Sequence, residues 1–202
     1  MSSERPNPPV DVLFLCTGNA ARSVMAGVSL TSRRPDLVIE TAGTLVVDGQ
    51  PMSWRTRAAI EGVGWDVPRH ASRQVHPPDL DGAGVVVAMA PEHVQWVRRT
   101  HPSAAGHTIT LPRLVHDLPG AAGHGSIRDQ VDGLGLADVE LEDWEEIVDP
   151  GGGEGEVFAA CASEIDELIG QVADRLVSGR GTDRARSSKP TSDDHDSRPA
   201  PW

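Results

Sequence analysis

The sequence predicts an α/β fold, a single doubly wound domain whose central parallel four-stranded sheet is flanked by helices. Short apolar runs alternate with longer amphipathic stretches between residues 10 and 178, an order typical of a parallel sheet with helices on both faces. Residues 85–89 are apolar throughout, as expected for a strand that is buried on both sides. Cys16 follows the first apolar run, at the edge where ligands bind in such sheets.

The first half of the domain is predicted to contain two strands and two helices. The first strand, residues 10–15, is mostly apolar, and the helix after the Cys16 loop begins at Ser23 and reaches residue 33. The second strand covers residues 37–42 and stops before a glycine. Residues 52–62 carry apolar side chains near helical spacing and are predicted to form a helix.

The second half repeats the alternation. After the buried strand at 85–89, a helix over 91–99 opens with Pro91, which is favoured in a first helical turn. The fourth strand is expected at 107–111. Residues 158–177 place their apolar side chains on one face and predict a long amphipathic helix.

Three segments fall outside this pattern. Residues 116–148 are acidic and rich in glycine and have no clear period, although a short helix fits their middle, so we expect a surface excursion or a lid. The acidic run 140–146 within it is interpreted as a solvated face. Residues 1–9 are expected to be flexible, and residues 179–202, which have almost no aliphatic side chains, are expected to form a disordered tail.

Composition limits the partners of the protein. The net charge of −12 argues against a nucleic-acid partner. No apolar run reaches the ~18 residues that a membrane span needs, and the polar N-terminus does not look like a signal peptide. Two cysteines, Cys16 and Cys161, fit a reducing compartment. We therefore expect a cytoplasmic protein, a monomer or weak dimer, with neither nucleic acid nor a membrane as partner.

Residues 16–23 combine a nucleophile with an anion receptor. The loop enters a helix N-terminus, where free N–H groups and the helix dipole favour an anion and also favour the thiolate form of a cysteine. Arg22 adds a guanidinium fork that matches two oxygens of a phosphate-like group. The competing interpretation is a buried cysteine that acts as a small apolar side chain. The expected phosphate-binding residues are Thr17, Gly18, Asn19, Ala20, Ala21, Arg22 and Ser23.

Four motifs in order resemble those of the low-molecular-weight protein tyrosine phosphatases. Residues 12–26 resemble the signature around the nucleophile, and residues 41–44 resemble the second strand of that family. Residues 68–75, which include His70, resemble its His-x-x-Arg-Gln segment, and residues 148–150 resemble its Asp-Pro loop. The resemblance covers residues 10–178 and implies a catalytic domain of that type over this range.

The resemblance also implies a mechanism, that of a phosphomonoester hydrolase with a cysteinyl-phosphate intermediate. Cys16 is then the nucleophile, Arg22 and the loop N–H groups hold the phosphoryl oxygens, and Asp149 is the general acid and base. Ser23 hydrogen-bonds the sulfur, and Asn19, held by His70, fixes the loop. No metal and no organic cofactor is required. The substrate is a phosphorylated protein, a small phosphoester or an oxyanion.

Departures from the family pattern leave the substrate open. Ala21 stands where many members carry a second cysteine, and glycines 151–153 stand where aromatic residues usually line the cleft. Missing aromatic walls weaken the expectation of phosphotyrosine, because ring stacking provides much of that selectivity. Asp149 also fits a simple turn before Pro150. The alternatives are an arsenate reductase that uses an external thiol and a non-catalytic phosphate-binding protein.

Overall fold

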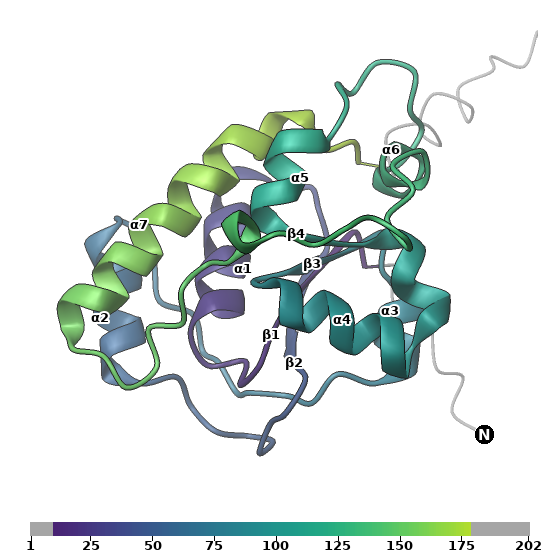
Figure 1. The fold of residues 1–202 in the computed structure, drawn as a ribbon. Helices are drawn as coiled ribbons and strands as arrows, with labels where there is room; N and C mark the ends of the chain where they lie inside the picture. The colour runs from purple at the N-terminus through teal and green to yellow at the C-terminus, as the bar shows by residue number, and fades with distance from the viewer. Residues whose placement is uncertain (1–9, 179–202) are drawn as a thin grey trace, which may run out of the picture.

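The computed structural model describes residues 10–178. The segments 1–9 and 179–202, for which flexibility and disorder were predicted, lie outside the described residues. Each strand of the described part is followed by one or more helices (Figure 1). Within it, no helix is both long and apolar enough to cross a membrane.

Four parallel strands form the central sheet in the order β2-β1-β3-β4. Cys16 pairs with Gly43 at the end of β2, and Leu15 pairs with Ala88 at the end of β3. The carboxyl end of β1 therefore lies between two neighbouring strands, and the predicted sheet is confirmed. The strands are β1 (Val12–Cys16), β2 (Ile39–Gly43), β3 (Val85–Ala88) and β4 (Thr108–Thr110).

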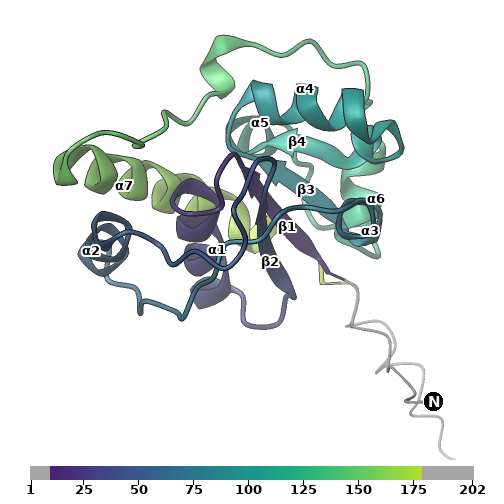
Figure 2. The same ribbon diagram turned by 90° about the horizontal axis from the view of Figure 1, so that it is seen from below.

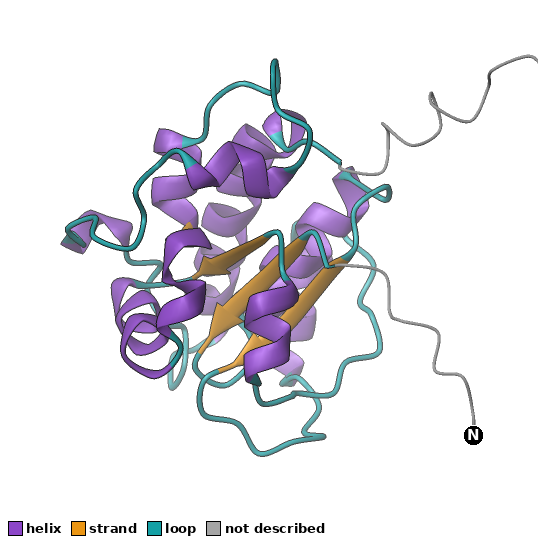
Figure 3. Ribbon diagram, turned by 90° about the vertical axis from the view of Figure 1, so that its right-hand side faces the viewer, coloured by secondary structure: helices purple, strands orange, loops and turns teal. Residues whose placement is uncertain are grey.

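Helices cover both faces of the sheet, as Figure 3 shows. They are α1 (Arg22–Arg33), α2 (Trp54–Gly62), α3 (Pro77–Gly82), α4 (Pro91–Thr100), α5 (Leu111–Asp117), α6 (Ile127–Asp132) and α7 (Gly155–Val172). Phe14 and Val87 pack with α1, α2, α5 and α7, whereas Leu13 and Val86 pack with α3 and α4. Successive side chains of a strand point to opposite faces, so the apolar runs bury both.

Several element boundaries differ from the prediction. The sequence predicts neither α3 nor α5: α3 buries Leu80 alone, so it has no apolar period, and α5 begins at Leu111, where the fourth strand was expected to end. The Thr110 hydroxyl caps α5, which explains why the strand stops there. The last helix starts at Gly155 and ends at Val172, where a short 3₁₀ turn, Ala173–Arg175, replaces its expected last turn.

Residues 116–148, for which a surface excursion or lid was predicted, are anchored to the domain by a few buried side chains. Ile127, Leu136 and Ile147 are buried in the larger apolar core, and the middle of the segment forms α6. The interpretation of residues 140–146 as a solvated face fails at Glu145, which is fully buried. An ion pair with Arg113 at 2.6 Å compensates the burial of this carboxylate.

Candidate active site

The loop between β1 and α1 lies at the carboxyl edge of the sheet. Figure 2 shows it beside the loop that follows β2, and two backbone hydrogen bonds join the two loops. The N–H of Thr44 donates to the Cys16 carbonyl at 2.9 Å, and the N–H of Leu45 donates to the Thr17 carbonyl at 3.0 Å. The helix begins at Arg22, one residue earlier than predicted, so its free N–H groups face the loop.

Cys16 is the last residue of β1 and is almost fully buried. Its Sγ atom lies 3.1 Å from the Ser23 Oγ atom. It also accepts a hydrogen bond of 3.3 Å from the backbone N–H of Asn19. Both groups favour a negatively charged sulfur. The structure therefore places Ser23 against the predicted nucleophile, as expected.

Asn19 has a φ angle of +48°, in the left-handed region that asparagine tolerates better than most residues. Its side-chain amide donates to the Ser23 hydroxyl at 3.1 Å and to the Thr41 hydroxyl at 2.9 Å. Its side-chain oxygen accepts from the backbone N–H of Arg73 at 3.0 Å. The hydrogen bond expected with His70 is present, from Nε2 to the Asn19 carbonyl at 2.6 Å. These contacts hold the backbone of the loop in one conformation.

Asp149 is brought to the loop from 127 positions away in the sequence. Its Oδ2 atom lies 2.6 Å from a terminal nitrogen of Arg22, and its Oδ1 atom accepts from the Gly151 N–H at 2.9 Å. The other terminal nitrogen of Arg22 donates to the Ile147 carbonyl at 3.1 Å. The Ile147 N–H in turn donates to the Met89 carbonyl after β3, at 3.0 Å, which ties the segment to the sheet.

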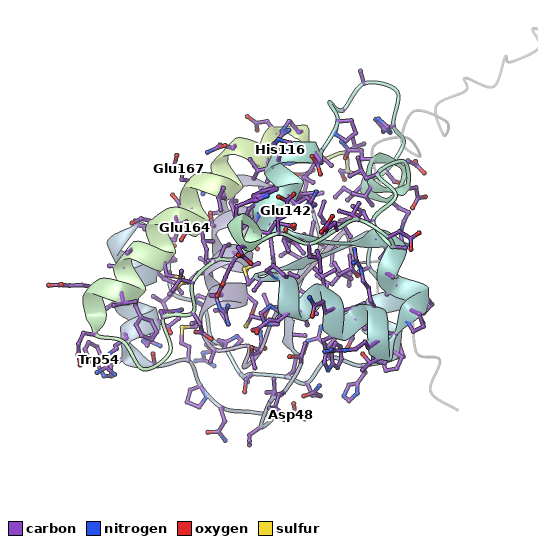
Figure 4. The ribbon with its side chains drawn as sticks, in the orientation of Figure 1. Asp48, Trp54, His116, Glu142, Glu164 and Glu167 are labelled. Atoms are coloured by element: carbon purple, nitrogen blue, oxygen red, sulfur yellow. The ribbon has the colours of Figure 1, made fainter. Side chains whose placement is uncertain are left out.

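A cleft of about 200 Å³ opens over Cys16. The start of α2 supports one wall, because Ser53 caps this helix and the Thr56 hydroxyl donates to the Ala20 carbonyl at 3.0 Å. Trp54, the first residue of α2, projects outward (Figure 4) and is 66% exposed. Phe158 is the one aromatic side chain of the lining. The lining residues are Cys16, Gly18, Ala20, Ala21, Arg22, Ser53, Thr56, Asp149, Gly151 and Phe158.

Two titratable groups near the loop are neutral. Burial, followed by the charge of Arg22, lowers the pKa of His93 to about 4, and its Nε2 atom is hydrogen-bonded to the Thr17 hydroxyl at 3.0 Å. Burial raises the pKa of the Cys161 thiol to about 12. Within residues 10–178, no group of histidine, cysteine, aspartate or glutamate side chains is placed to hold a metal ion.

Sequence reasoning located the loop, Asp149 and His70, but it missed several contributors. Thr41 and Arg73 lie in segments that the family resemblance covers, and their contacts with Asn19 depend on the pairing of β1 with β2. Phe158 was assigned to the last helix without a role in the cleft. His93 had no distinguishing neighbour in the sequence, because its partner Thr17 lies 76 positions away.

Comparison with known proteins identifies the family. The sequence profile of the family described as "Low molecular weight phosphotyrosine protein phosphatase" matches residues 11–132. The chain belongs to this family. The matched residues of this phosphatase include the whole Cys16 loop and His70, and they end before Asp149.

Similar proteins agree with this assignment. A protein-arginine-phosphatase of Geobacillus stearothermophilus is 28% identical over 169 residues, which cover 83% of this chain and 97% of that protein. A low molecular weight protein-tyrosine-phosphatase, Ptp, of Acinetobacter johnsonii is 28% identical over 101 residues, which cover 50% of this chain and 71% of Ptp.

Solved structures support the same fold for this phosphatase. The YwlE arginine phosphatase of G. stearothermophilus superimposes with a TM-score of 0.65 at 26% identity, covering 91% of this chain and 100% of that one. The low molecular weight protein tyrosine phosphatase of T. tengcongensis gives a TM-score of 0.64 at 26% identity, over 83% of this chain and 99% of that one. The chain is therefore a hydrolase of phosphoesters from a family that acts on phosphorylated proteins.

Proposed function

We propose that this phosphatase removes phosphoryl groups from protein side chains through a cysteinyl-phosphate intermediate on Cys16. The observation that carries the proposal is the convergence of Cys16, Arg22 and Asp149 on one cleft. A nucleophile, an anion receptor and a carboxyl group are the groups that this two-step reaction needs.

In the first step the Cys16 thiolate attacks phosphorus. The S–P bond forms while the bond from phosphorus to the leaving group breaks, and Asp149, as the carboxylic acid, donates its proton to the leaving atom. Arg22 and the N–H groups of the loop stabilise the equatorial oxygens as charge redistributes. The Ser23 hydroxyl, 3.1 Å from the sulfur, supports the thiolate before attack.

In the second step water attacks the phosphorus of the intermediate. The Asp149 carboxylate takes a proton from this water, the S–P bond breaks, and inorganic phosphate and the Cys16 thiolate are released. The Ser23 hydroxyl then hydrogen-bonds the departing sulfur. Each residue thus returns to the state in which it began the cycle.

Asp149 must leave Arg22 for this cycle to run. In the free protein the two side chains form an ion pair at 2.6 Å, and a bound phosphoryl group competes for the same guanidinium. The Asp149 side chain is 53% exposed, so it is free to turn toward the leaving atom. Gly152, with a φ angle of +80°, gives the adjoining segment a turn that other residues rarely adopt.

Phosphoarginine is a second candidate substrate beside phosphotyrosine. The relative that aligns over 97% of its length is named a protein-arginine-phosphatase. Four of the residues that line the cleft are glycine or alanine, and one, Phe158, is aromatic. A narrow aromatic slot for a tyrosine ring is therefore not formed by these walls, which favours a flexible, non-aromatic side chain.

The proposal is tested by turnover of para-nitrophenyl phosphate against pH for wild type, Cys16→Ser, Asp149→Asn and the control Cys161→Ser. We expect no turnover by Cys16→Ser, a kcat that is about 10²–10⁴-fold lower for Asp149→Asn, and wild-type turnover by Cys161→Ser. The rates of phosphate release from phosphotyrosine and phosphoarginine peptides then decide between the two substrates.

Two results would overturn the proposal. If folded, reduced wild-type protein hydrolyses none of these substrates, arsenate with a small-thiol reductant and simple phosphate binding are the functions to measure next. If Cys16→Ser retains wild-type turnover, the cysteinyl-phosphate intermediate is excluded.

A further inference from the structure

His93 is a buried residue to which the proposed reaction gives no role. It lies in the first turn of α4 and is 2% exposed, and its Nδ1 atom has no well-aligned hydrogen-bond partner within residues 10–178. A polar ring with an unpaired nitrogen is less favourable in a core than an apolar side chain of the same size. Packing alone therefore does not explain a histidine at this position.

The other ring nitrogen of His93 reaches the phosphate-binding loop. Its Nε2 atom and the Thr17 hydroxyl are hydrogen-bonded at 3.0 Å. Thr17 directly follows Cys16, and its carbonyl accepts from the Leu45 N–H at 3.0 Å. Thr17 is thus held through its side chain by α4 and through its backbone by the loop after β2.

The surroundings keep the ring of His93 uncharged. Burial and the nearby charge of Arg22 lower its pKa to about 4, and the charge of Asp149 and a contact with the Ala90 backbone oppose this shift to a lesser extent. The Glu92 carboxylate, 3.5 Å from Nε2, is largely exposed to solvent. A neutral ring adds a hydrogen bond to the loop without placing a second positive charge beside Arg22.

The two histidines hold the loop on either side of Gly18. His70 binds the Asn19 carbonyl and His93 binds the Thr17 side chain. Gly18, between them, is exposed, and a Cβ atom built on it would meet no atom within 4 Å. No side chain packs on Gly18, so the contacts of Thr17 and Asn19, including the hydrogen bond from Leu45 to the Thr17 carbonyl, set the position of its backbone.

We propose that His93 is a positioning residue of this active site, which fixes through Thr17 the backbone N–H groups of residues 17 and 18 that bind the phosphoryl oxygens. The inference rests on the proposed function, since it assumes that this loop binds phosphate. Donors that are already in place stabilise a transition state better than donors that must be ordered, and small displacements of such groups reduce rates strongly.

The test compares His93→Leu, Thr17→Val and the double variant. Inorganic phosphate affinity is measured by calorimetry, and kcat and KM are measured with para-nitrophenyl phosphate. We expect each single variant to weaken phosphate binding and to lower kcat/KM by about tenfold or more. The double variant should be no worse than the single variants, because both changes remove the same hydrogen bond.

His107→Leu is the matched control. His107 is also buried, and its Nε2 atom hydrogen-bonds a backbone carbonyl, that of Leu80, at 2.9 Å, away from the loop. This variant should lower the melting temperature while phosphate affinity stays at the wild-type value. Thr17→Val decides the question by itself if His93→Leu does not fold, because valine keeps the volume of threonine.

The proposal is overturned if both single variants bind phosphate as tightly as wild type, or if their losses add in the double variant. The calorimetric measurement does not require turnover. A wild-type protein that binds phosphate without hydrolysing any substrate would therefore contradict the proposed function alone, and the role of His93 would still be decided.

Discussion

At the scale of single residues, Asn19 joins more parts of the site than any other side chain described above. It is fully buried, and its polar atoms contact Ser23, Thr41, Arg73 and His70. Its left-handed backbone is a strained conformation for most residues, and such strain is common where a loop must present its N–H groups to a ligand. Substitutions of Asn19 can separate the contribution of its backbone conformation to stability from that of its hydrogen bonds.

We expect Asn19→Ala to lower the free energy of unfolding by about 2–4 kcal/mol, because it leaves buried partners unpaired and keeps an unfavourable φ angle. Asn19→Gly removes the same hydrogen bonds but accepts the φ angle, so it should recover about 1 kcal/mol of this loss. Urea unfolding measures both values. Equal stabilities for the two variants would contradict a contribution from the backbone strain.

At the scale of elements, the segment before Asp149 is anchored by Glu145. This buried carboxylate accepts hydrogen bonds from the Thr110 hydroxyl at 2.6 Å, from Arg113 at 2.6 Å and from the Glu142 N–H at 2.9 Å. Burial alone would raise the pKa of Glu145, but these donors outweigh it and lower the pKa. The end of β4, the start of α5 and the acid-bearing segment are joined at one point.

We expect Glu145→Gln to lower the free energy of unfolding by about 3–5 kcal/mol at neutral pH, because it leaves Arg113 without its buried partner. A loosened segment should also misplace Asp149. Turnover of phenyl phosphate should then fall more than that of para-nitrophenyl phosphate, because phenolate is the poorer leaving group and depends more on proton donation. Asp117→Asn is the control, since this carboxylate lies 3.5 Å from the same arginine and is partly exposed. Equal losses for both substrates would exclude an effect on proton donation.

Helices and strands were predictable where their sequence pattern depends only on nearby residues. The four strands and most long helices follow from apolar runs and helical spacing, which depend on neighbours in the chain. Glu145 shows why the rest was not predictable: its acidic neighbours indicate a solvated face, whereas its partners Thr110 and Arg113 lie 35 and 32 positions away. Tertiary hydrogen bonds of this kind leave no local pattern.

At the scale of the whole molecule, the site is likewise predictable only where its residues lie close together in the sequence or in a known motif. Cys16, Arg22 and Ser23 lie in one loop and could be read from it, and Asp149 was found through the Asp-Pro motif of the family. His93, Thr41 and Phe158 come from three separate elements and have no motif of their own. Their places depend on strand pairing and helix packing, which only the complete fold determines.

A partly exposed carboxylate, Asp166, also holds α7 against α1. Asp166 of α7 accepts from the Ser29 hydroxyl at 2.7 Å, from Arg33 at 2.6 Å and from the Trp65 indole N–H at 2.8 Å. Glu164 and Glu167, its neighbours on α7, point to solvent instead (Figure 4). Asp166 therefore links α1, α7 and the segment after α2.

This network predicts how the stability of the domain depends on pH. Burial would raise the pKa of Asp166, but hydrogen bonds from Arg33, Ser29 and Trp65 lower it to about 2. Because the folded-state pKa is below the unfolded value, the contribution of Asp166 is complete above about pH 4 and is lost as the pH falls toward 2. We expect Asp166→Asn to lower the free energy of unfolding by about 2 kcal/mol at pH 7, and this difference should shrink steadily below pH 4.

Urea unfolding of wild type and Asp166→Asn at pH 7, 5 and 3 measures that difference. Asp36→Asn serves as the control, because its ion pair with Arg34 at 2.8 Å is half exposed and should contribute less than about 1 kcal/mol. A difference for Asp166→Asn that stays constant from pH 7 to pH 3 would mean that the side chain acts through packing and not through its charge. The decline expected at low pH follows only if the ionised carboxylate holds the two helices together.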